Sequence, residues 1–105
     1  MKYESLAARL EANSIRGECG CRLWTGRLNN AGYPVFTKRV AHKPHPVPHY
    51  AHRAAFEIEY EVAIPRGLEL DHLCVTPNCI EPSHLEPVTT AENLRRRDAR
   101  RAAAH

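Results

Sequence analysis

The spacing of apolar residues predicts helices mixed with short strands. Residues 3–13 place Leu6, Ala7 and Leu10 on one face of a helix, within an N-terminal helical region of residues 1–16. Residues 21–28 and 32–40 read as strands on either side of the sequence NNAG, which is typical of a hairpin loop, so we expect these two strands to pair. Residues 41–49 contain three prolines and predict an extended loop.

The second half of the chain has a clearer order. Residues 50–61 predict a helix, residues 64–73 a turn that leads into a short strand, and residues 75–84 a loop. Residues 89–104 predict the last helix, which Thr89 or Thr90 can cap. Thr89 and Glu92 have the spacing of a capping box.

Length and composition place these elements in one domain. The chain has 105 residues, with one Trp and two Phe, so its core is small and a bound metal would add useful stability. We expect a core at 19–97 and a basic C-terminal helix or tail at 95–105. The sequence has no apolar run long enough to predict a membrane span, and its start lacks the apolar region of a signal peptide. We therefore expect a cytoplasmic protein, in which four cysteines favour metal binding over disulfides.

Charge is arranged in blocks. Residues 19–56 hold six Lys or Arg and no acidic residue, whereas residues 57–92 hold eight acidic residues and only Arg66 as a base. Residues 95–105 hold five Arg and one Asp. Basic blocks favour a polyanionic partner, and the acidic centre favours a divalent cation. The simpler interpretation is that the C-terminal arginines form a solvated helix face.

Two groups of residues carry candidate chemistry. Cys74, Cys79 and His84 follow one another at C-x4-C-x4-H spacing, and Cys21 or Cys19 could complete a tetrahedral zinc site. The alternative is a set of buried free thiols.

Asp71, His72 and Asn93 suggest a second site. Asp71 is a hard oxygen ligand better suited to Mg²⁺ than to zinc, Asn93 offers a neutral oxygen, and His72 could act as a base. A structural hydrogen bond of the Asp-His pair, and an ordinary asparagine near a helix start, are the simpler interpretations.

The segment LDHLC…C…PSHLEPVTTAENLRR, together with CRLWTG, GY, AHRAAFE and IPRGLELDH, resembles the HNH endonucleases. The similarity is to the small phage and intron types, which are related to the His-Cys box homing endonucleases, and it covers residues 21–97. It implies an α+β domain with the ββα-metal fold, encoded by a phage, a prophage or a bacterial host. One departure is Glu81, where relatives usually have Asn.

The resemblance also implies residue roles. His72 matches the general base, and Asp71 and Asn93 match the ligands of a catalytic Mg²⁺ or Mn²⁺. Cys21 matches the fourth ligand of a structural zinc ion, with Cys19 in reserve. The implied activity is metal-dependent hydrolysis of double-stranded DNA, by a monomer that nicks or a homodimer that cuts both strands. The alternatives are a non-catalytic, zinc-stabilised DNA-binding module and a zinc-dependent protein-interaction domain.

Basic and amide side chains supply candidate DNA contacts. A two-stranded ribbon fits the major groove, so the predicted hairpin could carry Arg27, Asn29, Asn30, Lys38 and Arg39 into it. Arg53 could contact the scissile phosphate or pair with Glu57. The predicted phosphate contacts of the last helix are Arg95, Arg96, Arg97, Arg100 and Arg101.

Overall fold

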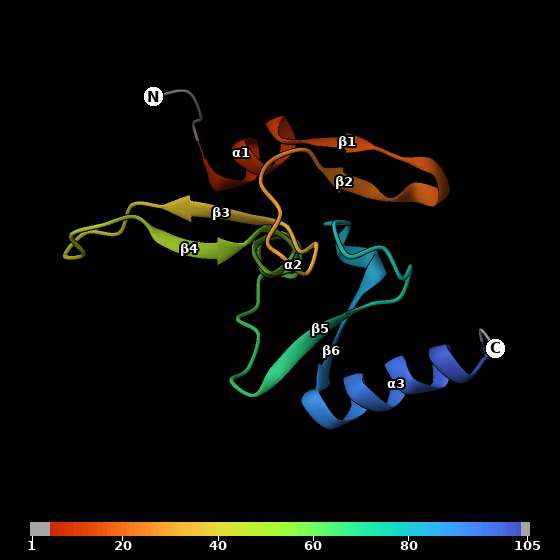
Figure 1. Cartoon of the computed structure of the whole chain (residues 1–105). Coiled ribbons are helices and arrows are strands. Elements are labelled where there is room, and N and C mark those ends of the chain that lie inside the picture. The colour runs from red at the N-terminus through yellow and green to blue at the C-terminus, as the bar shows by residue number, and fades with distance from the viewer. Residues whose placement is uncertain (1–4, 104–105) are drawn as a thin grey trace.

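The computed structural model describes residues 5–103, which form an α+β fold of three α-helices and three antiparallel strand pairs (Figure 1). In chain order the elements are α1 (Leu6–Ala12), β1 (Ser14–Arg16), β2 (Arg22–Trp24), β3 (Val35–Lys38), β4 (Val47–Tyr50), α2 (Ala51–Tyr60), β5 (Leu68–His72), β6 (Leu85–Thr89) and α3 (Thr90–Ala103). Within 5–103, none of the helices has the length and apolar character needed to cross a membrane.

Helix α1 is shorter than the predicted region of residues 1–16. Its first turn is capped by the Ser5 hydroxyl, which accepts a hydrogen bond from the backbone N–H of Ala8 at 3.1 Å. It ends at Ala12 with Asn13 as its C-cap, and the next three residues form strand β1 instead of more helix. Residues 1–4 of the prediction lie outside the described residues.

The predicted pairing around NNAG is confirmed only next to the turn, and most of the two strands have other partners. Strand β2 pairs with β1 on one side, and on the other side its Leu23 bridges Cys79 in the loop after β5. Both edges of β2 are therefore occupied, which leaves no edge for β3. The 29–32 turn closes a single bridge, between Leu28 and Pro34. The loop is held by Asn29, whose side-chain oxygen accepts hydrogen bonds from the backbone N–H groups of Ala31 and Tyr33.

The proline-containing stretch at 41–49 is not entirely a loop, because strand β4 begins at Val47 and pairs with β3. Pro48 lies opposite Thr37 in this pair. Proline lacks the N–H that an inner strand would need on both sides, but it is tolerated in an edge strand, and both strands of a two-stranded sheet are edges. The three prolines therefore did not exclude a strand here.

The second half follows the predicted order. Strands β5 and β6 pair antiparallel with Leu68 opposite Thr89 and His72 opposite Leu85, and α3 packs against both. This β5–β6–α3 unit has the ββα arrangement expected of the ββα-metal fold. Thr89 caps α3 by accepting from the Glu92 N–H at 3.1 Å. The Glu92 carboxylate pairs with arginines rather than closing the predicted capping box.

Helix α2 lies between the two halves of the molecule (Figure 1). One side contributes to the hydrophobic cluster of Leu10, Trp24, Phe36, Ala51, Ala54 and Ile80. Its Phe56 belongs to a second cluster, which also contains Ile64, Leu70 and Leu85 and supports the β5–β6 pair. Ile80 lies in the loop between β5 and β6, so the first cluster also anchors the loop that carries the candidate metal ligands.

Candidate metal centre and active site

Four soft ligands converge in one place. The sulfur atoms of Cys21, Cys74 and Cys79 and a ring nitrogen of His84 all lie within 4.8 Å of one another. The Nδ1 atom of His84 is 3.6 Å from the sulfurs of both Cys21 and Cys79. Three thiols and one imidazole form a tetrahedral zinc-type donor set, so this group could bind a metal such as zinc.

Backbone contacts explain why these ligands meet. The Trp24 N–H donates to the Asn78 carbonyl at 3.0 Å, and the Ile80 N–H donates to the Arg22 carbonyl at 2.8 Å. These bonds dock the loop against β2 and place Cys21 beside it. Cys19, the reserve ligand in the sequence interpretation, is exposed and has the unusual φ of 60°. The structure therefore selects Cys21 as the fourth member of the cluster.

The environment of Cys79 disfavours its ionised form. Burial, together with the neighbouring Cys21 and Cys74, raises the pKa of the Cys79 thiol to about 12, although backbone hydrogen bonds partly oppose this shift. Thiolate is the form that binds metal, so metal binding here must release protons. Acid should therefore weaken metal binding at this cluster.

His72 is buried, and its ring is held in one orientation. Its Nε2 atom lies 3.0 Å from the backbone carbonyl oxygen of Cys79. A carbonyl can only accept, so Nε2 carries the proton and Nδ1 of the neutral ring is free to act as a base. Burial lowers the pKa of His72, and the Cys79 hydrogen bond and the Asp71 charge only partly offset this effect. The imidazole is therefore neutral at neutral pH.

A second buried histidine packs against His72. The rings of His52 and His72 lie 5.0 Å apart between centroids, and Tyr33 stacks on His52 at 5.7 Å. Burial lowers the pKa of His52 to about 3, and the charges of His72 and Arg53 add to this shift. The sequence analysis did not single out His52, although a histidine at the first turn of an amphipathic helix could have suggested a buried role.

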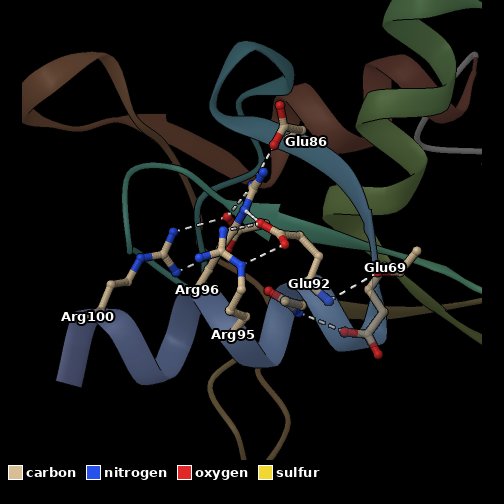
Figure 2. A network of polar contacts seen from close by, with 9 residues as sticks. Glu69, Glu86, Glu92, Arg95, Arg96 and Arg100 are labelled. Atoms are coloured by element: carbon tan, nitrogen blue, oxygen red, sulfur yellow. Dashed lines mark hydrogen bonds and ion pairs between the residues drawn. The ribbon is translucent and has the colours of Figure 1, made fainter. Parts of the chain in front are cut away.

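Asp71 is buried and accepts hydrogen bonds from two arginines of α3 (Figure 2). Arg100 donates to both carboxylate oxygens, at 3.1 and 3.0 Å, and Arg96 donates to Oδ2 at 3.0 Å. Burial alone would raise the pKa of Asp71, but the hydrogen bonds and charges of Arg100 and Arg96 outweigh it and lower the pKa. A carboxylate has about four lone-pair sites, so one remains on Oδ1 for a cation.

Asn93, the other predicted cation ligand, lies in the first turn of α3 and contacts Glu69. The Asn93 side-chain N–H donates to Glu69 at 2.7 Å, and the Thr90 hydroxyl donates to the other oxygen of the same carboxylate at 3.0 Å. Glu69 was missed in the sequence analysis. Its position two residues before Asp71 on a strand was the available signal, because residues i and i+2 share a face.

The predicted catalytic residues line one cavity of about 430 Å³, to which Glu69, Asp71, His72, Asn93, Arg97 and Arg100 all contribute. Asp71 and Asn93 reach it from β5 and α3, respectively. Their oxygen atoms are the ligand type that Mg²⁺ and Mn²⁺ prefer, so the donor set fits a hard divalent cation. The cavity therefore brings an imidazole, carboxylate and amide oxygens, and cationic side chains together.

The arginines of α3 differ in what they contact. Arg95 and Arg96 form ion pairs with Glu92, and Arg96 also pairs with Glu86 on β6 (Figure 2). Arg97 has a more open position: its side chain is 55% exposed, and its ion pair, with Asp98, is long at 4.0 Å. Among residues 5–103, no ion pair involves Arg101. The five arginines are therefore not one uniform basic surface.

The other predicted DNA contacts are distributed over several elements. Arg27, Asn29 and Asn30 line a separate cavity of about 720 Å³. Lys38 ends β3 and Arg39 follows it, so both belong to the β3–β4 hairpin rather than to one ribbon with Arg27. The Arg53 guanidinium donates to the Leu68 carbonyl at 3.3 Å, and Glu57 accepts from the Ile64 N–H at 2.8 Å. The expected single ribbon is therefore wrong. Of the two alternatives for Arg53, the pair with Glu57 is not formed among residues 5–103.

Glu81 has a structural role in the loop that holds His84. Its carboxylate accepts from the backbone N–H of Ser83 at 3.4 Å and from the Ser83 hydroxyl at 3.0 Å, and it thereby caps the short 3-10 helix Pro82–His84. The side chain also pairs with Arg16 at 3.4 Å. A carboxylate here can thus hold the turn that presents His84 to the three thiols.

Comparison with known proteins gives one family. No curated protein and no solved structure matches the chain significantly. Residues 49–95 match the family model described as HNH endonuclease. The match begins at the end of β4 and includes His72, Cys74, Cys79, His84 and Asn93, although it spans somewhat less than half of the chain. This segment is therefore similar to the HNH endonucleases.

Proposed function

We propose that the protein is a metal-dependent endonuclease that hydrolyses phosphodiester bonds of double-stranded DNA with one catalytic cation. The observation that carries this proposal is the orientation of His72. Its Nε2–H is bonded to the Cys79 carbonyl, which leaves Nδ1 as the basic atom of a side chain that lines the same cavity as Asp71 and Asn93. A DNA-binding module without catalysis has no need for a neutral, oriented imidazole beside two oxygen ligands.

In the proposed reaction, Nδ1 of His72 removes a proton from the attacking water as it approaches phosphorus. The ring does not have to reorient, because the Cys79 carbonyl already holds it. The lowered pKa of His72 keeps the base unprotonated at neutral pH. Tyr33 and His52 pack beside the ring and limit its movement.

Asp71 and Asn93 would hold Mg²⁺ or Mn²⁺. When bound, such a cation stabilises charge on a non-bridging oxygen and on the leaving 3′ oxygen. Asp71 supplies the charged oxygen, and its paired arginines keep the carboxylate ionised and directed at the cavity. Following the family resemblance, the products would carry 5′-phosphate and 3′-hydroxyl ends.

The cluster of Cys21, Cys74, Cys79 and His84 would hold zinc in a structural role. Cys79 links the two sites, because its sulfur belongs to the cluster and its carbonyl accepts from His72. Cysteines that bind metal rather than form disulfides suit the reducing cytoplasm of a bacterial host or of a cell that expresses a phage gene.

DNA contacts would begin with Arg97, which lines the active-site cavity without a close carboxylate partner. Arg101 would extend this contact along α3. Lys38 and Arg39 on the β3–β4 hairpin, and Arg27 and Asn29 beside it, would supply further contacts. One site in one domain nicks a single strand, so cleavage of both strands would require a homodimer.

The test uses supercoiled plasmid, purified protein and Mg²⁺, with EDTA as the control. We expect nicked plasmid with Mg²⁺ and none with EDTA. The His72→Ala variant should lose cleavage while it keeps metal content and DNA binding, because His72 lies outside the Cys3His cluster. Cleavage by the parent protein should fall on acidification with a midpoint below the usual 6.5 of histidine, since the pKa of His72 is lowered.

Two results would contradict this proposal. Equal cleavage by His72→Ala would exclude His72 as the base. Binding of DNA without cleavage in Mg²⁺ or Mn²⁺ would favour the non-catalytic zinc-stabilised DNA-binding module instead.

A further inference from the structure

Glu69 contacts the predicted cation ligand Asn93 but has no part in the chemistry described above. It lies on β5 two residues before Asp71, so both side chains face α3. Its half-buried carboxylate accepts from the Asn93 side-chain N–H at 2.7 Å and from the Thr90 hydroxyl at 3.0 Å (Figure 2). Both oxygens of Glu69 are thus bonded to the first turn of α3.

The two ends of an asparagine amide differ chemically. The NH₂ end can only donate, and the oxygen can only accept a hydrogen bond or bind a cation. An ionised carboxylate also accepts only, so the end of Asn93 that faces Glu69 must be the NH₂ group. The amide oxygen then points away from Glu69 and is left available. Without such a partner, a half-turn about the last side-chain bond would exchange the two ends.

We propose that Glu69 is a positioning residue that fixes the amide of Asn93 with its oxygen, and not its nitrogen, available to the catalytic cation. The second hydrogen bond, from Thr90, prevents the carboxylate from turning with the amide. Outer partners of metal ligands act in this way elsewhere, and their loss weakens metal affinity roughly 10–100-fold. The inference rests on the proposed role of Asn93 in holding the cation.

The test is a double-mutant cycle read out as metal affinity, independently of cleavage. Mn²⁺ binding to the zinc-loaded protein is measured by titration calorimetry for the parent, Glu69→Gln, Asn93→Ala and the double variant. Glutamine has nearly the same shape as glutamate, but it can donate as well as accept, so it permits either orientation of the amide. Circular dichroism and zinc content check that each variant is folded.

We expect Glu69→Gln to weaken Mn²⁺ binding roughly tenfold. In the Asn93→Ala background the same change should alter affinity by less than about twofold, because Glu69 would then have no amide to orient. The matched control is Glu59→Gln, which removes one negative charge from an exposed position on α2 and should change affinity by less than about twofold.

Three outcomes would overturn the inference. Unchanged affinity in Glu69→Gln would mean that the amide needs no orienting partner. If Glu69→Gln weakened Mn²⁺ binding equally in the parent and in the Asn93→Ala background, Glu69 would act directly, by its charge or as a ligand. No Mn²⁺ binding by the parent protein would remove the ligand that Glu69 is said to orient. If the cycle behaves as expected and no variant cleaves DNA, the inference stands and the nuclease proposal fails.

Discussion

Replacing His52 by phenylalanine should make the protein less sensitive to acid. His52 is 5% exposed, packs among the rings of Tyr33, Tyr50 and His72, and has a buried Nδ1 without a hydrogen-bond partner among residues 5–103. Its pKa in the folded protein is about 3, chiefly because of burial, against 6.5 for an unperturbed histidine. Phenylalanine can keep the ring contacts and cannot be protonated.

The magnitude follows from linkage between protonation and folding. Between pH 6.5 and 3 the unfolded chain binds a proton at His52 and the folded protein does not, so stability falls as pH falls. The loss is about 1.4 kcal/mol per pH unit within this window. From pH 7.5 to pH 5, His52 alone should therefore reduce the free energy of unfolding by about 2 kcal/mol.

Urea unfolding at pH 7.5 and pH 5 measures this effect in the parent, in His52→Phe and in the control His45→Gln, which changes an exposed histidine. Acid also weakens metal binding by the cysteines, but this loss is common to all three proteins. The decrease in stability should thus be about 2 kcal/mol smaller in His52→Phe than in the parent and unchanged in the control. Equal decreases in all three would refute the argument that His52 stays neutral in the folded state.

Two further predictions concern the metal cluster and the basic helix. Cys74→Ser should lower zinc content and the melting temperature, whereas Cys19→Ser should change neither, because Cys74 lies in the cluster and Cys19 does not. A structural zinc ion contributes roughly 10–16 kcal/mol to folding, so elemental analysis and thermal melting should separate the two variants plainly. Arg97→Ala should reduce the slope of log DNA affinity against log salt concentration by about 0.9. Arg95→Ala should change this slope little, because Arg95 already pairs with Glu92. Equal slopes for the two variants would contradict the distinction between paired and open arginines.

The features that sequence predicted best depend on local patterns. Helix α2 and strand β5 lie where the sequence pattern places them, and α3 begins after Thr89, which caps it as its position before the helix suggests. Cys74, Cys79 and His84 were recognised because they lie close together in the chain, and the structure brings them together in space.

The features that sequence missed depend on contacts between distant segments. The NNAG turn was correctly expected to reverse the chain, but the partner of β2 depended on β1 and on the loop around Cys79. The choice of Cys21 over Cys19 came from the family resemblance and is confirmed, and the docking of that loop against β2 gives its physical reason. Likewise, the five arginines look equivalent in sequence, and only the positions of Asp71 and Glu92 on the folded chain separate the paired ones from the open ones.

Cys79 gives the two proposed sites a shared physical basis. Its sulfur belongs to the metal cluster, and its carbonyl accepts the hydrogen bond that leaves Nδ1 of His72 as the base. The residue is fully buried, so the carbonyl would lose this bond without gaining water if the loop shifted slightly. A metal bound to the Cys79 sulfur would therefore also fix the tautomer of His72, which is not one of its ligands. Such a link would explain why a small domain with few large apolar residues has the proposed structural metal site in the loop beside the proposed catalytic base.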